Sequence, residues 1–145
     1  MPHLTLQVSP GGPLVDVAVG VSRPREAALR AIGQAIPAPI QIRALLDTGA
    51  SCTCMDPIIL RNLGLTPTGV GAVYTPSTGL QPHQANQYDV SLTLLHPALN
   101  FSFFSIPVLE SQLAIQGIQA LIGRDLLRSC LFVYDGQAGI FTLAF

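Results

Sequence analysis

The sequence predicts an all-β protein built around one hydrophobic core. Its 145 residues include 12 prolines and 13 glycines, which divide the chain into short segments. These segments are rich in Val, Ile, Leu, Thr and Phe, a composition typical of strands joined by turns. Residues 88–94 alternate apolar and polar side chains, as a strand with one buried face does. Because this length suits one domain, we expect residues 1–145 to form a single unit.

Each expected strand is an apolar run that ends at Pro, Gly or a polar cluster. The expected strands span residues 4–8, 14–21, 40–46, 70–75, 88–95, 101–108, 120–122, 131–134 and 139–145. A short helix is predicted to begin after the N-cap Asp56, with Pro57 in its first turn, and to end at Gly64. A second short helix is predicted over residues 124–128. The Ala-rich centre of residues 22–37 is compatible with about two helical turns or with a mobile insert.

Composition narrows the possible partners and cofactors. A net charge of −1 with only 10% charged residues argues against nucleic-acid binding. No apolar run reaches the roughly 18 residues of a membrane-spanning helix, and the N-terminus lacks the features of a secretory signal. We therefore expect a cytoplasmic protein with no membrane partner. The three cysteines and three scattered histidines do not have metal-ligand spacing, so we expect no metal and no other cofactor.

One segment carries the residues of a chemical site. The strand at residues 40–46 runs into Asp47, Thr48, Gly49, Ala50 and Ser51. A carboxylate directly after a buried strand is unfavourable unless it is hydrogen-bonded, paired or used in chemistry. Thr48 can hold a turn through its hydroxyl, and Gly49 allows another segment to approach closely. A simple Asx turn is the alternative interpretation of Asp-Thr-Gly alone.

A second segment, Ala-Leu-Ile-Gly-Arg-Asp-Leu-Leu at residues 120–127, adds specificity to this motif. In this order, the two segments resemble the retropepsin-like aspartic proteases, the single-domain relatives of pepsin. Residues 87–94 also resemble the returning strand of the retroviral flap hairpin, and residues 131–145 resemble the end of bacterial members. The resemblance implies a retropepsin-like barrel half with one or two short helices and a flap hairpin, closed as a homodimer.

The family resemblance implies a catalytic role for Asp47, Thr48 and Gly49. Peptide hydrolysis in this family needs two Asp-Thr-Gly loops, and this sequence has one, so two copies would pair about a two-fold axis. The two Asp47 carboxylates would share one proton and activate a water between them. Thr48 would reach across to the other subunit, and Gly49 would donate from its backbone. The strands at residues 4–8 and 143–145 would interleave between the subunits.

The resemblance also implies which residues meet the substrate. These are Ala50, Ser51, Tyr74, Thr78, Gly79, Leu80 and Ile122, with a flap over residues 70–85 and its tip near 77–80. Leu45, Val73 and Ile122 are candidates for an apolar pocket. Gly123 and Arg124 would support the site. Viral relatives place an acid where Ser51 stands, and it pairs with the arginine, so Asp16, Asp56 or Asp125 are candidate partners of Arg124.

These features predict an aspartic endopeptidase whose partners are a second copy of itself and a peptide or protein substrate. The alternative is a non-catalytic peptide-binding or assembly module with the same fold. A cysteine nucleophile such as Cys52 has little support, because no histidine is near it in the sequence.

Overall fold

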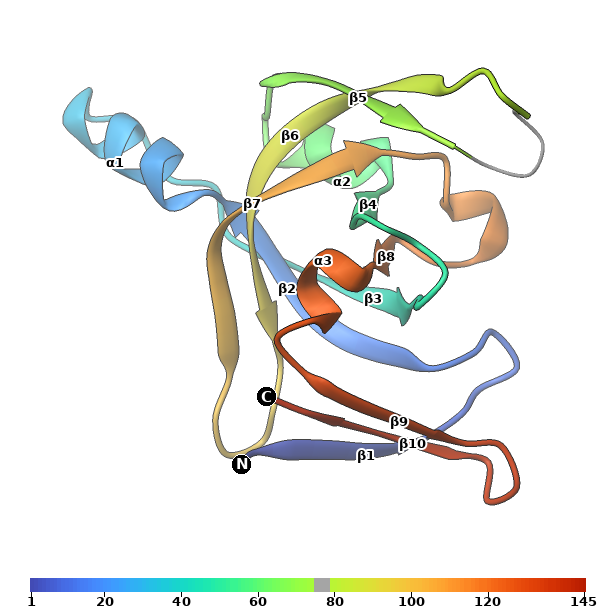
Figure 1. The fold of residues 1–145 in the computed structure, drawn as a ribbon. Helices are drawn as coiled ribbons and strands as arrows, with labels where there is room; N and C mark the ends of the chain where they lie inside the picture. The colour runs from blue at the N-terminus through green and yellow to red at the C-terminus, as the bar shows by residue number, and fades with distance from the viewer. Residues whose placement is uncertain (75–78) are drawn as a thin grey trace.

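The computed structural model describes residues 1–74 and 79–145, most of which lie in strands and the loops that join them (Figure 1). The strands are β1 (His3–Gln7), β2 (Leu14–Val21), β3 (Ile40–Leu46), β4 (Cys54–Met55), β5 (Gly69–Val73), β6 (His83–Leu94), β7 (Phe101–Glu110), β8 (Ala120–Ile122), β9 (Leu131–Asp135) and β10 (Ile140–Ala144). The helices are α1 (Arg23–Ala31), α2 (Pro57–Asn62), α3 (Arg124–Leu127) and the 3-10 turn η1 (Ala114–Gln116). The all-β prediction is confirmed, and every expected strand is present.

A closed barrel forms the body of the structure. Its strands follow the order β2-β3-β8-β4-β7-β6, and β6 pairs back onto β2 from Val17–Leu94 to Val21–Val90. β5 continues the sheet beyond β6 as an antiparallel hairpin. The β3–β8 and β4–β7 pairs are parallel, whereas the other pairs of the barrel are antiparallel. The parallel β3–β8 pair places the carboxyl ends of two distant segments side by side.

The barrel interior is filled by the apolar faces of these strands. In β6 the buried side chains alternate with half-buried ones, as the sequence pattern predicts. The main core contains Phe141 and Leu143 of β10 together with barrel side chains, so it joins the barrel to the terminal sheet. The fully buried large side chains belong to this core, except Leu113, which belongs to a second, smaller cluster. They are Phe141, Met55, Leu60, Leu63, Leu92, Leu113, Leu143, Val15, Val17, Val19, Val90 and Val108.

The two chain ends pair with each other in a separate three-stranded sheet of order β1-β10-β9 (Figure 1). Leu4 lies opposite Leu143, and Thr5 and Thr142 join their hydroxyls across the pair at 2.9 Å. These two strands thus pair with each other within one chain. Because β10 is the central strand, the open edges of this sheet belong to β1 and β9.

Local capping explains both longer helices. Ser22 accepts a hydrogen bond from the Arg25 backbone N–H and begins α1, so the Ala-rich segment is a helix rather than a mobile insert. Asp56 caps α2 through the Ile58 N–H, with Pro57 in the first turn, as predicted. Within the described residues, no helix combines the length and apolar character that crossing a membrane requires.

Candidate active site

The candidate site forms where β3 and β8 end together. Leu46 lies opposite Ile122 in their parallel register, and the next backbone N–H, that of Asp47, donates to the Ile122 carbonyl at 2.9 Å. The fold therefore brings together the two segments that the sequence singled out. It also places Asp47 at the point where the chain leaves the sheet, half-buried rather than in the core.

A tight turn after Asp47 holds its carboxylate. Oδ1 of Asp47 accepts the Gly49 backbone N–H at 2.8 Å, and the Asp47 carbonyl accepts the Ala50 N–H at 3.2 Å. A Cβ atom on Gly49 would lie 3.0 Å from that same Oδ1, so the glycine keeps the approach open. Thr48 and Gly49 are exposed. Among the described residues, this carboxylate has a single hydrogen-bond donor, which leaves lone pairs for a water or a proton.

The start of α3 lies directly against this loop. The Arg124 backbone N–H donates to the Ala50 carbonyl at 2.9 Å. Gly123 packs on the backbone of Cys52, and a Cβ atom there would lie only 2.6 Å from the Cys52 carbonyl carbon and oxygen. Any larger residue at position 123 would push the loop and the helix apart. The supporting position expected for Gly123 therefore has a steric reason.

Asp125 and the fully buried Thr53 anchor the far end of the loop. The Asp125 carboxylate accepts the Thr53 backbone N–H at 3.0 Å and the Thr53 hydroxyl at 2.8 Å. The same hydroxyl accepts the Gly123 N–H at 3.2 Å. Sequence reasoning did not find this pair, because it treated Asp125 only as a possible partner of Arg124.

Arg124 has a different partner from those the sequence suggested. Its Nη1 donates to the Thr48 carbonyl at 2.8 Å. The ion pairs found among residues 1–74 and 79–145 join Arg30 with Glu26 and Arg43 with Asp16, and none includes Arg124. Asp56 and Asp125 are occupied with backbone and hydroxyl donors, so neither pairs with Arg124. The Arg124 guanidinium instead binds a backbone carbonyl of the Asp47 loop.

The residues expected to meet a substrate are spread around this loop. Ala50 is half-buried, and Ser51 is exposed. Tyr74 and Leu80 stand at the two sides of the β5–β6 hairpin and are 68% and 96% exposed. Gly79 has a φ of +59°, a turn conformation that suits glycine. Thr78 and the expected tip at 77 and 78 lie outside the described residues.

Ile122 is not placed as expected. It is only 2% exposed and belongs to the main core, so its side chain does not face the loop surface. Its neighbour Leu121 is half-buried and packs on a second apolar cluster, together with Leu45 and Val73. This cluster joins β3, β8 and the hairpin. Leu121, rather than Ile122, is therefore the partly exposed β8 side chain beside this second cluster.

Comparison with solved structures identifies the architecture. The crystal structure of a retropepsin-like aspartic protease from Rickettsia conorii matches with a TM-score of 0.58 at 15% sequence identity, over 99% of this chain and 91% of that chain. This chain has the retropepsin-like fold. The retroviral protease-like domain of Ddi1 from Leishmania major matches with a TM-score of 0.43 at 15% identity, over 86% and 83% of the two chains. No protein-family model and no curated sequence matches.

Cys54, which follows the Asp47 loop in this retropepsin-like fold, is a poor nucleophile. Burial raises the pKa of the Cys54 thiol to about 12, and the neighbouring Cys52, Asp125 and Asp47 raise it further. Burial also raises the pKa of Cys130. Because the thiolate is the reactive form, Cys54 stays unreactive near neutral pH.

A second acid, Asp56, lies close in sequence but outside the site. It is 3% exposed, and its carboxylate accepts three backbone N–H groups, from Ile58 at 3.0 Å, Leu113 at 2.9 Å and Ala114 at 2.8 Å. Burial by itself would raise its pKa, but these three donors outweigh burial and hold the pKa below its usual value. Asp56 is therefore a structural anion that joins α2 to η1.

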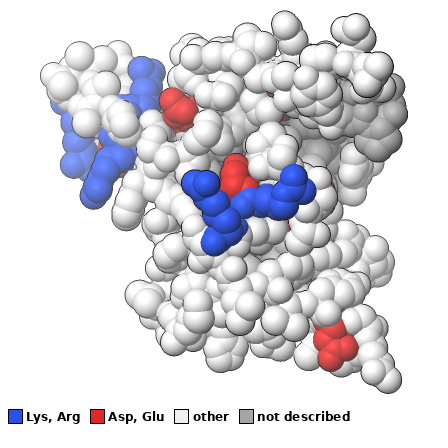
Figure 2. Space-filling model, viewed as in Figure 1, with Lys and Arg blue, Asp and Glu red and all other residues white. Residues whose placement is uncertain are grey.

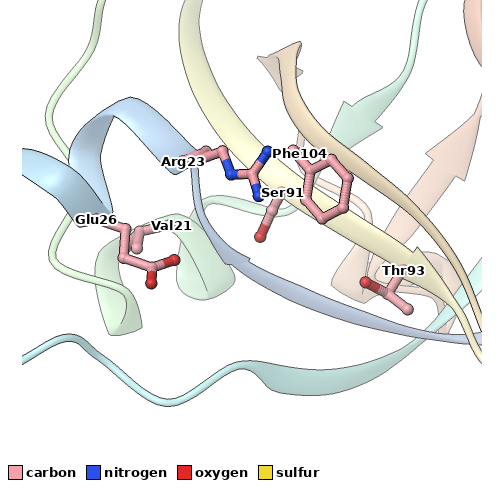
Figure 3. Close-up of a pocket in the computed structure, with 6 residues that line it drawn as sticks. All are labelled: Val21, Arg23, Glu26, Ser91, Thr93 and Phe104. Atoms are coloured by element: carbon pink, nitrogen blue, oxygen red, sulfur yellow. The ribbon is translucent and has the colours of Figure 1, made fainter.

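Basic side chains gather in two places on the face shown in Figure 2, over α1 and over α3. At α1, a polar groove of about 270 Å³ separates the helix from the barrel and is lined by Val21, Arg23, Glu26, Ser91, Thr93 and Phe104 (Figure 3). The Arg23 guanidinium lies over the Phe104 ring at 4.6 Å, which ties α1 to β7. Asp47 does not line this groove, so the groove is separate from the candidate site.

Proposed function

We propose that the chain is an aspartic endopeptidase that acts as a homodimer, with one Asp47 contributed by each copy. The observation that carries this proposal is the Asp47 carboxylate itself. It stands at the joined ends of two parallel strands in a retropepsin-like fold, beside an exposed Thr48 and Gly49. Among the described residues it has one hydrogen-bond donor. A carboxylate with free lone pairs at the surface can bind a water, which a saturated structural carboxylate cannot do.

The chemistry follows from bringing two such carboxylates together. Two like charges a few ångströms apart disfavour double ionisation, so the pair retains one proton. The ionised Asp47 takes a proton from the water as the water oxygen attacks the peptide carbonyl carbon. The protonated Asp47 donates a hydrogen bond to the carbonyl oxygen. The tetrahedral intermediate then breaks its C–N bond as the leaving nitrogen receives a proton. One water is consumed, and no covalent intermediate with the protein forms.

The substrate would be an extended peptide that lies between the Asp47 loop and the β5–β6 hairpin. Leu45, Val73 and Leu121 would line an apolar pocket beside it, so we expect a preference for apolar residues next to the cut. Ala50 and Ser51 would meet the peptide from the loop, and Tyr74, Thr78, Gly79 and Leu80 from the hairpin, which would act as a flap.

The terminal sheet supports pairing of two copies. The open edges of β1 and β9 can continue a sheet into a second chain. The outer strand β9 also exposes large apolar side chains, with Leu131 at 56%, Val133 at 49% and Tyr134 at 54%. A homodimer about a two-fold axis would cover these side chains and present two Asp47 loops to one substrate.

Mixing wild-type chains with an Asp47→Asn variant tests both parts of the proposal. Asn is nearly isosteric and keeps an oxygen for the Gly49 N–H, so the variant should fold and pair but not cleave. With equal amounts and random pairing, about one dimer in four holds two carboxylates, and the activity per total chain should fall in that proportion. Peptide cleavage and oligomeric mass are measured on the same samples.

A linear fall with the wild-type fraction would show that each chain acts alone and would refute the shared site. Full cleavage by pure Asp47→Asn would refute the carboxylate mechanism. A confirmed wild-type dimer that cleaves no member of a diverse peptide library at any pH would favour the alternative, a peptide-binding or assembly module.

A further inference from the structure

The peptide bond between Thr48 and Gly49 is held at both of its polar ends. Its carbonyl accepts Nη1 of Arg124 at 2.8 Å, and its N–H donates to Oδ1 of Asp47 at 2.8 Å. In a planar trans peptide the C=O and the N–H belong to one rigid unit and point in opposite directions. Fixing the carbonyl therefore fixes the direction of the N–H.

We infer that Arg124 is a positioning residue that acts on Asp47 through the Thr48–Gly49 peptide. The inference rests on the proposed function, because it concerns the same carboxylate. Arg124 does not touch Asp47 by a hydrogen bond in the described residues, and no ion pair involves it there. Its effect passes through the amide between them.

Two physical effects act along this path. The guanidinium stops the peptide unit from rotating, which keeps the Gly49 N–H aimed at Oδ1. A cation that binds the carbonyl also polarises the amide and strengthens its N–H as a donor, because hydrogen bonds in a chain reinforce one another. Both effects direct Oδ1 toward the Gly49 N–H and leave the other oxygen of Asp47 for the water.

The uncharged Ser51 leaves the Arg124 guanidinium available to bind the Thr48 carbonyl. An acid at position 51 would compete with the Thr48 carbonyl for the guanidinium, but the serine carries no charge. The Arg124 backbone N–H is already bound to the Ala50 carbonyl, so the root of the side chain is fixed beside the loop. With an uncharged serine at position 51, the Arg124 guanidinium binds the peptide that supports Asp47.

The test compares Arg124→Met, Arg124→Lys and the matched control Arg128→Met in the full chain. Arg128 is exposed and follows on the same helix, so its loss removes an equal charge without touching the loop. Two quantities are measured for each variant, the Gly49 amide proton shift by NMR and the kcat and KM for a peptide substrate. Oligomeric mass is determined in parallel, and kinetics are run at concentrations where the variants are paired.

We expect Arg124→Met to move the Gly49 amide proton upfield and to lower kcat by about tenfold with little change in KM. Arg124→Lys, which keeps the charge and one donor, should recover part of both effects, and Arg128→Met should resemble wild type. An unchanged Gly49 resonance in Arg124→Met, or equal changes in Arg124→Met and Arg128→Met, would overturn the inference. If Arg124→Met does not fold, the uncharged Arg124→Gln takes its place, and a wild-type Gly49 resonance and kcat in Arg124→Gln would overturn the inference.

The NMR readout separates this inference from the proposed function. Should the wild type show no peptidase activity while the Gly49 resonance still depends on Arg124, the proposed function fails and the structural link stands. If the wild type cleaves peptides but the Gly49 resonance does not change in Arg124→Met, the proposed function stands and the link between Arg124 and Asp47 fails.

Discussion

Two acids only a few residues apart, Asp47 and Asp56, have opposite surroundings. Asp47 is half-buried at the end of β3 and accepts one backbone N–H. Asp56 is buried at the start of α2 and accepts three. Both follow a strand and both make a local turn to a residue two positions later, so their local sequence environments are similar. Their difference comes from segments far away in the chain.

The comparison shows how distant segments make the surroundings of two carboxylates different. The segment around η1 gives Asp56 two donors from residues more than fifty positions away, at a separation of 57 for Leu113. No comparable donor reaches the Asp47 carboxylate among the described residues; the distant segment there binds the backbone around it instead. Three donors saturate the Asp56 carboxylate, whereas the Asp47 carboxylate keeps lone pairs that no donor among the described residues occupies.

The largest expected effect is that substituting Asp47 and Asp56 changes different properties, cleavage for Asp47 and stability for Asp56. Asp47→Asn should lower peptide cleavage by more than about a thousandfold while changing stability by less than about 0.5 kcal/mol. Asp56→Ala should instead change stability much more than cleavage. It removes a helix cap and leaves buried N–H groups without an acceptor, so it should lower the free energy of unfolding by about 3 kcal/mol. Urea denaturation and cleavage assays on both variants measure the two effects.

Asp16→Asn is the control for this pair, since Asp16 is an exposed acid whose closest basic partner is 3.8 Å away. It should leave both stability and cleavage near wild type. A large loss of stability in Asp47→Asn, or of kcat alone in Asp56→Ala, would show that the two roles are not separate.

A smaller effect should appear in the pH dependence of stability. The three N–H donors hold the folded-state pKa of Asp56 below its unfolded value, so its stabilisation is present above about pH 4 and is lost as the pH falls through the folded-state pKa. Asp56→Asn cannot titrate and should therefore lose less stability than wild type between about pH 5 and pH 2. Parallel acid denaturation slopes in the two proteins would contradict this account.

The smallest effect is expected at Cys54. Its raised pKa, about 12, keeps the thiol protonated, so Cys54→Ala should retain cleavage activity within about twofold. The loss of a small buried side chain should lower stability by about 1 kcal/mol. A complete loss of activity in a folded Cys54→Ala protein would revive a thiol mechanism.

Most of the strands and helices could be predicted from the sequence, because the patterns that mark them lie within each element. Alternation marks β6, and the Asp56–Pro57 cap marks α2. Sequence reasoning missed β4, because two residues carry no periodicity and Cys54–Met55 are held by β7 and β8 rather than by their own sequence. It began β6 at residue 88 rather than at His83, where polar side chains obscure the pattern.

The site was only partly predictable for the same reason. The motif located the Asp47 loop and the segment that contacts it, but β8 is apolar at all three positions, so the sequence did not reveal that Leu121 rather than Ile122 faces the second cluster. The partner of Arg124 is a backbone carbonyl, which every residue carries and no pattern marks. The Thr53–Asp125 pair joins side chains 72 positions apart.

That separation has a consequence for biosynthesis. The contacts that shape the Asp47 loop come from residues 122–125, more than seventy positions further along the chain. A nascent polypeptide emerging from the ribosome would therefore carry Asp47 without the framework that orients it until those residues have been made.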